Sequence, residues 1–251
     1  MTILKKLILC VFCATLLSGC ASTPTQEKEM PLEELYNLGM DAFEKNDTKK
    51  AVHYFDEVER QYPYSTWAVN AQIMSAYIYY KNTEYTDAIL VLNRFLELHP
   101  GNKYAPYALY LKGMSYYEQV SDVTRDQKMT DLAKNSFQRL SVLYPNTPYA
   151  KDAVNKIKLA NNHLAGKEMD IGRYYLKTHR YISAANRFEE VVRLYQTSMH
   201  IEEALYRLSA SYLALGLTDE AKRTAAVLGY NYPDSKWYKK AYKMLKENGI
   251  S

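Results

Sequence analysis

The sequence predicts an all-α solenoid of about five helix pairs, closed by a C-terminal capping helix. Three observations lead to this prediction. One motif recurs along the 251-residue chain at a nearly constant interval. Apolar residues from Leu32 onward recur at helical spacing, and strand-like alternation is nowhere sustained. Glycine is scarce, with nine residues in the whole chain. A repeat that cannot bury its own apolar face has to stack on its neighbours, so the copies are expected to form one continuous array.

The recurring motif is clearest at Ala51–Val58, where an alanine is followed four positions later by a large apolar residue. The alanines that mark the five copies are Ala51, Ala88, Ala133, Ala184 and Ala221. The interval is 37 residues both from Ala51 to Ala88 and from Ala184 to Ala221. A proline closes four of the copies, at Pro63, Pro100, Pro145 and Pro233, and Gln196 stands where the fourth copy would close. Because proline has no amide hydrogen, it is expected to end the second helix of each pair.

A small residue also stands ahead of each marker alanine, on the segment predicted to form the first helix of the pair. These residues are Gly39, Ala76, Gly113, Gly172 and Ser209. Small residues on both helices allow a close antiparallel approach, while Phe55 or its equivalent fills the space between one pair and the next. Together with the period, this pattern is that of the tetratricopeptide repeat, a 34-residue unit followed here by a short spacer.

The repeats are expected at about 32–65, 69–102, 106–147, 165–198 and 202–235. The third repeat is about eight residues too long, and the excess, Gln119–Asp126, is expected as an excursion at one edge between its two helices. Residues 149–164 continue the apolar periodicity with no stop before Gly172, which predicts one long helix running into the fourth repeat. After Pro233, the spacing of Trp237, Ala241, Met244 and Leu245 predicts the capping helix.

The first nineteen residues are predicted to be a signal peptide, because Lys5 and Lys6 precede an apolar run, Leu7–Leu17, that is too short to span a bilayer comfortably. The run ends in Leu17-Ser18-Gly19-Cys20, which resembles the bacterial lipobox, so Cys20 is expected to be acylated and to become the first mature residue. The alternative is an ordinary cleaved signal with a chance cysteine. Residues 20–31 are then a lipidated polar tether. Ala21 rather than aspartate follows the cysteine, which under the enterobacterial sorting rule permits export to the outer membrane, so the protein is expected to be anchored in the cell outer membrane, facing the periplasm.

The composition argues against catalysis. The other two cysteines, Cys10 and Cys13, leave with the signal, so the mature chain is expected to have no thiol catalysis and no cysteine metal site. The five histidines are scattered, and no glycine-rich phosphate loop is present. The net charge of +4 is not gathered into a basic stretch interleaved with aromatics, so no nucleic-acid partner is expected. The expected protein is a non-enzymatic scaffold with no catalytic residue, no metal and no cofactor besides the lipid on Cys20.

The first helix of each repeat is expected to line the concave face. In the first three repeats the lining positions are mostly aromatic, and they form a predicted peptide groove: Tyr36, Met40, Phe43, Ile73, Tyr77, Tyr80, Tyr107, Tyr110, Met114 and Tyr117. The last two repeats are less aromatic at these positions. Tyrosine offers a large contact area at low entropic cost and keeps a hydroxyl group for the backbone of an extended peptide. The alternative, that these rings pack against neighbouring helices, stays open for each of them.

The ordered combination of lipobox, polar tether, five repeats, a long third-to-fourth connection and an elongated third repeat resembles the ComL family, the lipoproteins of the outer-membrane β-barrel assembly machinery. The resemblance covers essentially the whole mature chain. It implies that residues 32–147 receive the C-terminal targeting segment of unfolded outer-membrane proteins. It also implies that residues 148–251 bind the POTRA region of the barrel protein BamA, beside other lipoproteins of the machinery.

One residue role follows from the same resemblance. Asn186-Arg187-Phe188-Glu189 matches the family stretch whose arginine pairs with a POTRA carboxylate, so Arg187 is the predicted POTRA contact. The chain departs from the family pattern in two places: the turn Tyr195–Ile201 lacks the closing proline, and Arg125-Asp126 lies in a shortened form of the family's longer loop. The alternative function is a repeat lipoprotein that coordinates envelope division or peptidoglycan synthesis, and the identity of the partner would discriminate the two.

Overall fold

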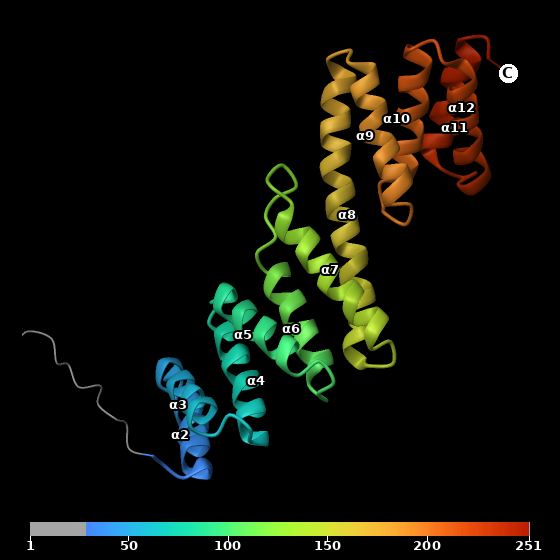
Figure 1. The fold of residues 1–251 in the computed structure, drawn as a ribbon. Coiled ribbons are helices and arrows are strands. Elements are labelled where there is room, and N and C mark those ends of the chain that lie inside the picture. Colours follow the sequence, from blue (N-terminus) through green and yellow to red (C-terminus); the bar gives the residue numbers. More distant parts are fainter. Residues whose placement is uncertain (1–28, 251) are drawn as a thin grey trace, which may run out of the picture.

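The computed structural model describes residues 29–250, and over this range the chain is all helical, with eleven helices and no strand (Figure 1). The predicted all-α repeat fold is therefore confirmed. The signal peptide, the lipidation site Cys20 and the tether up to residue 28 lie outside the described residues. In order, the helices are α2 (Leu32–Glu44), α3 (Thr48–Gln61), α4 (Thr66–Lys81), α5 (Tyr85–Leu98), α6 (Ala105–Tyr117), α7 (Lys128–Leu143), α8 (Pro148–Lys177), α9 (Tyr181–Leu194), α10 (Ile201–Ala214), α11 (Thr218–Asn231) and α12 (Lys236–Glu247).

The helices form successive antiparallel pairs that stack from α2 at one end of the molecule to α12 at the other (Figure 1). From α2 to α11 each helix packs mainly on its neighbours in sequence, and α12 packs on both α10 and α11. The first helices also touch one another directly, α2 on α4, α4 on α6, α6 on α8, and α10 on α12. The first helices therefore form one layer of the array, and side chains on them can line a common surface.

The closest contacts inside the pairs join a small residue on the first helix to a phenyl ring on the second. A methyl group added at Gly39 would lie 2.8 Å from Cε1 of Phe55, and one added at Gly172 would lie 2.5 Å from Cε1 of Phe188. The third pair is the same, with 2.6 Å between a methyl at Gly113 and Cε1 of Phe137. Even alanine has no room at these positions, which explains why the motif requires glycine where the second helix carries phenylalanine.

The second helices end as the closing prolines predict, and one of them ends without a proline. α3, α5, α7 and α11 each stop two residues before the proline. α9 stops at Leu194, although Gln196 stands in the proline position, and the amide of Tyr195 still donates to the carbonyl of Val191 at 3.0 Å. Tyr195 is 9% exposed. α9 thus ends in the place that proline marks in the other copies, at a residue whose side chain is buried.

The first helix of the fourth pair, α8, is a single helix of 30 residues that also packs on the third pair. Its first part packs on α6 and α7, and its second part packs on α9. The extra residues of the third repeat, and Gln127 directly after them, lie against the middle of this helix: Nζ of Lys167 donates to the carbonyl of Thr124 at 2.7 Å, and Nδ1 of His163 lies 2.7 Å from Oε1 of Gln127. The insertion thus bridges the third repeat and α8.

The array ends in α12, which buries Ala241 and Leu245 against α10 and α11. The opposite side of the helix is exposed to solvent. None of the described helices is long and apolar enough to cross a membrane.

The contact of Gly172 with Phe188 gives the first prediction. Gly172→Ala should lower the free energy of unfolding by about 1–3 kcal/mol, because the overpacking outweighs the helix propensity that alanine usually gains. Urea denaturation followed by circular dichroism measures the change. Gly101→Ala, at a position with no atom within 4 Å of the added methyl, is the control and should stay within about 0.5 kcal/mol of wild type. Adding Phe188→Leu to Gly172→Ala should recover part of the lost free energy of unfolding, because the smaller side chain makes room for the methyl group. A double variant whose loss equals the sum of the two single losses would contradict the overpacking explanation.

Candidate partner-binding surfaces

Two groups of ring contacts lie on the first helices of the N-terminal repeats. The ring centroids of Phe43 on α2 and Tyr77 on α4 lie 6.1 Å apart. Tyr107 on α6 is 5.5 Å from Tyr149 at the start of α8, and Tyr149 is 5.5 Å from Tyr110. Burial raises the pKa of Tyr107 to about 12, and the nearby hydroxyls of Tyr77 and Tyr149 add to the shift. We call this set, with Tyr80, the aromatic face: Phe43, Tyr77, Tyr80, Tyr107, Tyr110 and Tyr149.

Several residues of the predicted groove are engaged in packing. Tyr36 makes edge contacts with Phe55 at 5.3 Å and with Trp67 at 4.8 Å between ring centroids. Ile73 is 8% exposed and belongs to the core between α4, α5 and α6. The hydroxyl of Tyr110 donates to Oδ2 of Asp152 at 2.7 Å. These three side chains hold neighbouring repeats together.

The remaining groove residues are partly buried and line the sides of the same helices. Met40 packs against the core of the first repeat, and Met114 and Tyr117 pack against the core of the third. Nζ of Lys156 on α8 lies 4.8 Å from the centroid of the Tyr117 ring. At the other edge, burial and the nearby Glu118 raise the pKa of Tyr80. The other groove tyrosines, Tyr77, Tyr80, Tyr107 and Tyr117, are partly exposed. Each makes a single ring or cation contact, with Phe43, Tyr85, Tyr149 and Lys156 respectively, whereas Tyr36 and Tyr110 each contact two rings.

The sequence interpretation missed Tyr149 and Trp67, although a signal for both was present. An aromatic residue stands four positions after each closing proline, at Trp67, Tyr104, Tyr149 and Trp237. Three of these rings contact a tyrosine of the preceding first helix: Trp67 contacts Tyr36, Tyr149 contacts Tyr110, and Trp237 stacks on Tyr206 at 5.4 Å. The recurring aromatic marks the junction between successive first helices.

In the C-terminal repeats an ion network replaces the aromatic rings. Arg173 on α8 donates from Nε and Nη2 to the two carboxylate oxygens of Glu203 on α10, each at 2.9 Å. Nε of Arg207 donates to the same carboxylate at 2.6 Å. Burial opposes ionisation of Glu203, but the hydrogen bonds from Arg173 and Arg207 outweigh burial and lower its pKa to about 2. The pair Arg173–Glu203 joins the fourth and fifth repeats.

Arg187, the predicted partner contact, lies on α9 and already has acidic neighbours. Its Nη1 donates to Oε2 of Glu168 on α8 at 3.0 Å and lies 3.9 Å from Oε2 of Glu190. Its side chain is 39% exposed, against 17% for Glu168. The hydrogen bond from Arg187 to Glu168 raises the pKa of the arginine. A partner carboxylate that bound Arg187 would join or replace this pair. It would also meet a cavity of about 460 Å³ beside the pair, which is lined by Glu168, Glu190 and residues Thr124–Gln127 at the end of the insertion.

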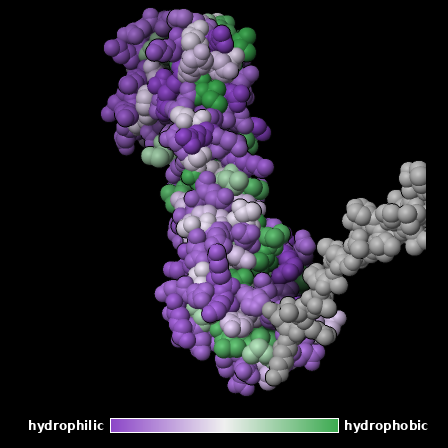
Figure 2. Space-filling model, turned by 90° about the vertical axis from the view of Figure 1, so that its left-hand side faces the viewer, coloured by the Kyte–Doolittle hydropathy of each residue, from purple (hydrophilic) through white to green (hydrophobic). Residues whose placement is uncertain are grey.

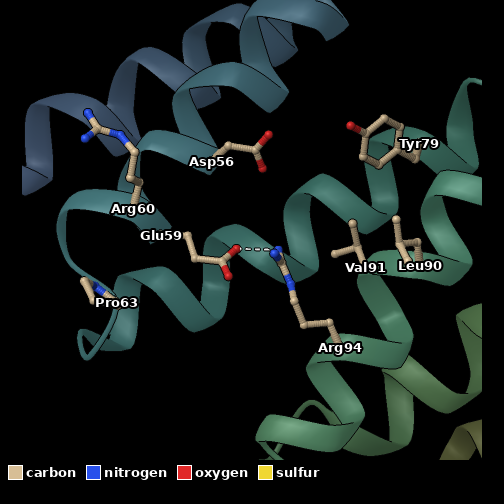
Figure 3. A pocket seen from close by; sticks show the side chains of 8 residues that line it. All are labelled: Asp56, Glu59, Arg60, Pro63, Tyr79, Leu90, Val91 and Arg94. Atoms are coloured by element: carbon tan, nitrogen blue, oxygen red, sulfur yellow. Dashed lines mark hydrogen bonds and ion pairs between the residues drawn. The ribbon is translucent and has the colours of Figure 1, made fainter. Parts of the chain in front are cut away.

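A second cavity, which the sequence did not predict, opens between the second helices α3 and α5 and has a volume of about 560 Å³ (Figure 3). Pro63, Leu90 and Val91 supply apolar lining, and Arg94 binds Glu59 at 2.7 Å in its wall. Burial, with the neighbouring Glu59, raises the pKa of Asp56. Within residues 29–250, no group of three or more histidine, cysteine or acidic side chains could hold a metal ion. On the face drawn in Figure 2, hydrophobic residues form separate small patches on a largely hydrophilic surface.

The stacked helix pairs define a tetratricopeptide-repeat protein. The family model described as "YfiO: Outer membrane lipoprotein" matches residues 28–228, and the chain belongs to this family. Three relatives carry the name "Outer membrane protein assembly factor BamD". The protein of Caulobacter vibrioides is 45% identical over 97% of this chain and 81% of its own length. That of Rickettsia prowazekii is 46% identical, with 98% of both chains covered. That of Neisseria meningitidis serogroup A is 33% identical, covering 92% of this chain and 93% of its own.

The family that the sequence resembles is thereby confirmed. Among solved structures, the tetratricopeptide domain of P58(IPK) aligns with 86% of this chain and 56% of its own, with a TM-score of 0.45 and 17% identity. The fold assignment rests on the helix pairs themselves.

The ion network gives the second prediction. The folded pKa of Glu203, about 2, lies below its ordinary value of 4.5, so the carboxylate stabilises the fold above pH 4.5 and loses this effect as the pH falls toward 2. Glu203→Gln should therefore lower the free energy of unfolding by about 1–3 kcal/mol at pH 7, and by progressively less below pH 4.5. Glu220→Gln, which removes the exposed pair with Arg223, is the control and should cost under about 0.5 kcal/mol. If the free energy of unfolding lost in Glu203→Gln did not change with pH, the lowered pKa of Glu203 would not be its cause.

Proposed function

We propose that this protein is an outer-membrane protein assembly factor, a non-enzymatic scaffold of the machinery that inserts β-barrel proteins. The observation that carries the proposal is near full-length similarity to relatives with that name, over 97% and 98% of this chain for the first two. The structure supports a scaffold, because its distinguishing features are surfaces on a stacked helical array. As a family resemblance alone does not fix a function, each surface needs its own test.

The aromatic face is the proposed site for the C-terminal targeting segment of an unfolded outer-membrane protein. Its rings extend over α2, α4, α6 and the start of α8, which gives a long track with apolar faces and hydroxyl groups. Such a surface suits an extended segment that needs both side-chain contacts and hydrogen bonds to its backbone. Because Tyr36, Ile73 and Tyr110 are engaged in packing, ligand contacts are assigned to Tyr77, Tyr80, Tyr107 and Tyr117.

The C-terminal half, residues 148–251, is the proposed POTRA-binding part, with Arg187 as its arginine contact. The 39% exposure of the side chain leaves it accessible, and Glu168 holds the guanidinium in one orientation at 3.0 Å. A planar guanidinium can bind a second carboxylate through its remaining donors, which a lysine in this position could not do in the same geometry. Further lipoproteins of the same machinery are proposed partners of the array.

Cys20 is the proposed lipidation site and places the protein on the periplasmic face of the outer membrane. The lipobox-like sequence Leu17–Cys20 and the family description support this anchor. Several acyl chains hold a protein on a membrane durably, whereas a single chain is marginal. The mass of the mature chain purified from membranes tests the anchor, since an unmodified Cys20 would refute it.

The groove assignment gives the third prediction. Replacing Tyr77, Tyr80 and Tyr117 together by alanine should weaken binding of a peptide that ends a barrel protein of the same organism by about tenfold or more, because three aromatic contacts are lost. Fluorescence anisotropy measures the affinity. The control replaces three exposed tyrosines elsewhere, Tyr64, Tyr174 and Tyr230, and should bind as wild type does. Equal loss in both variants, or none in either, would move the peptide site away from the aromatic face.

The docking assignment gives the fourth prediction. Arg187→Gln should weaken binding to the purified POTRA region of the barrel protein by roughly 3- to 30-fold, as expected for a partly exposed charge pair, and Arg187→Lys should recover only part of the affinity. Surface plasmon resonance measures both variants. Arg193→Gln, an exposed arginine on the same helix, is the matched control and should not change the affinity. If wild type failed to bind POTRA and instead bound septal or glycan-synthesising proteins, the alternative function in envelope division or peptidoglycan synthesis would replace this one.

A further inference from the structure

The C-terminal capping helix carries a concentrated positive charge on its exposed side. Five lysines lie on α12, against a single carboxylate, Glu247. All five are exposed: Lys236, Lys239, Lys240, Lys243 and Lys246. At 3.6 residues per turn these positions share one side of the helix, opposite the buried Ala241 and Leu245. We call these five side chains the basic face.

Little on the chain itself neutralises the basic face. Among the described residues, one of the five lysines forms an ion pair: Lys243 lies 3.7 Å from Glu247, with side chains 77% and 62% exposed. Such an exposed pair contributes little free energy. The lysine side chains on one side of this helix repel one another. A negatively charged surface that bound there would relieve this repulsion and would also attract the lysines.

Aromatic rings stand on both edges of the basic face. On one edge, three cations surround the ring of Trp237: Nζ of Lys240 lies 4.6 Å from its centroid, Nζ of Lys236 5.2 Å, and Cζ of Arg207 5.8 Å. Tyr206 stacks on the same ring and fixes its position. On the other edge Tyr242 is 59% exposed. Tryptophan, tyrosine and arginine are enriched at protein interfaces, so Trp237, Tyr242 and Arg207 are side chains suited to binding a partner beside the lysines.

We propose that the basic face, with Trp237 and Tyr242 at its edges, docks an acidic segment on the surface of a partner protein. A membrane is the less suitable occupant, because an amphipathic helix binds a bilayer through its apolar side, and the apolar side of α12 is buried against α10 and α11. The anchor proposed at Cys20 also precedes α2, which lies at the opposite end of the structure from α12 (Figure 1).

A second copy of the chain is the other occupant to consider, because α2 carries four carboxylates and no basic residue. Contact between α12 of one copy and α2 of the next would be head to tail, and such contacts build open chains of molecules unless they close into a ring. A separate acidic partner satisfies the charge without this consequence. α12 lies within residues 148–251, so this surface rests on the proposed function of that half and adds to it a second contact, separate from Arg187. Its test involves no POTRA domain and can fail while the Arg187 prediction holds.

The test uses the full chain purified in detergent and a fluorescein-labelled decapeptide of alternating glutamate and serine, with binding followed by anisotropy at low salt. The combined variant Lys239→Glu, Lys243→Glu and Lys246→Glu should weaken binding by at least about tenfold. The matched control, Lys45→Glu, Lys49→Glu and Lys50→Glu, makes the same charge change at exposed positions near the other end and should stay within about twofold of wild type. Tyr242→Ala should weaken binding by about threefold, which a purely electrostatic surface would not show.

Three results would overturn the proposal. Equal losses in the α12 variant and in the control would show general charge attraction without a site. If the wild type bound phosphatidylglycerol vesicles but not the peptide, and the α12 variant did not bind the vesicles, the face would be assigned to a membrane. The third result is that the wild type self-associates as its concentration rises. If both the α12 variant and the double variant Glu33→Lys, Glu34→Lys abolished this self-association, the face would be assigned to a second copy. Thermal unfolding by circular dichroism checks that the variants are folded, and lysine-to-glutamine replacements at the same three positions repeat the test should the glutamate variant unfold.

Discussion

The contact between a small residue on the first helix of a pair and a large ring on the second sets the geometry on which the rest of this structure depends. At Gly172 even a methyl group would lie 2.5 Å from the Phe188 ring, so the two helices are as close as their side chains allow. The spacing of the helices within a pair fixes where the next pair can stack. Because the same contact recurs at Gly39 and Gly113, the first helices come to lie beside one another. A surface that spans several repeats can exist only because of this regularity.

The helix α8 joins two kinds of surface on one continuous element. Its first turn carries Tyr149, the last ring of the aromatic face, and its last turns carry Arg173, where the ion network begins. The insertion of the third repeat fastens to its middle through Lys167 and His163. A single helix with contacts on both sides gives the two halves a defined relation to one another, which suits a scaffold that holds two partners at once. The change from aromatic to ionic surface thus falls on a continuous helix.

The proposed binding residues are divided between stabilising the array and contacting a partner. Tyr36 and Tyr110 hold junctions between repeats, and Tyr77 and Tyr107 extend the same track with fewer fixed contacts. Arg187 is held by Glu168, so a partner that bound it as proposed would meet an arginine already oriented, at the cost of sharing its charge. Preorganisation of this kind lowers the entropy lost on binding. It also means that loss of a side chain from either surface can change both stability and affinity, which is why matched control variants are needed.

The sequence by itself determined the helix pairs, the ends of the second helices and the capping helix. These depend on residues near one another in the chain: the spacing of Ala51 and Phe55, the stop at Pro63, and the apolar stripe of α12. It also determined much of the aromatic character of the inner face. Only the tertiary structure decided which of these rings are partly exposed and which are taken up by packing between helices. Tyr149 joins the aromatic face, Ile73 is lost to the core and Arg187 pairs with Glu168 because residues of different helices meet there. Such meetings depend on how one helix stacks on another, and no local periodicity encodes that stacking.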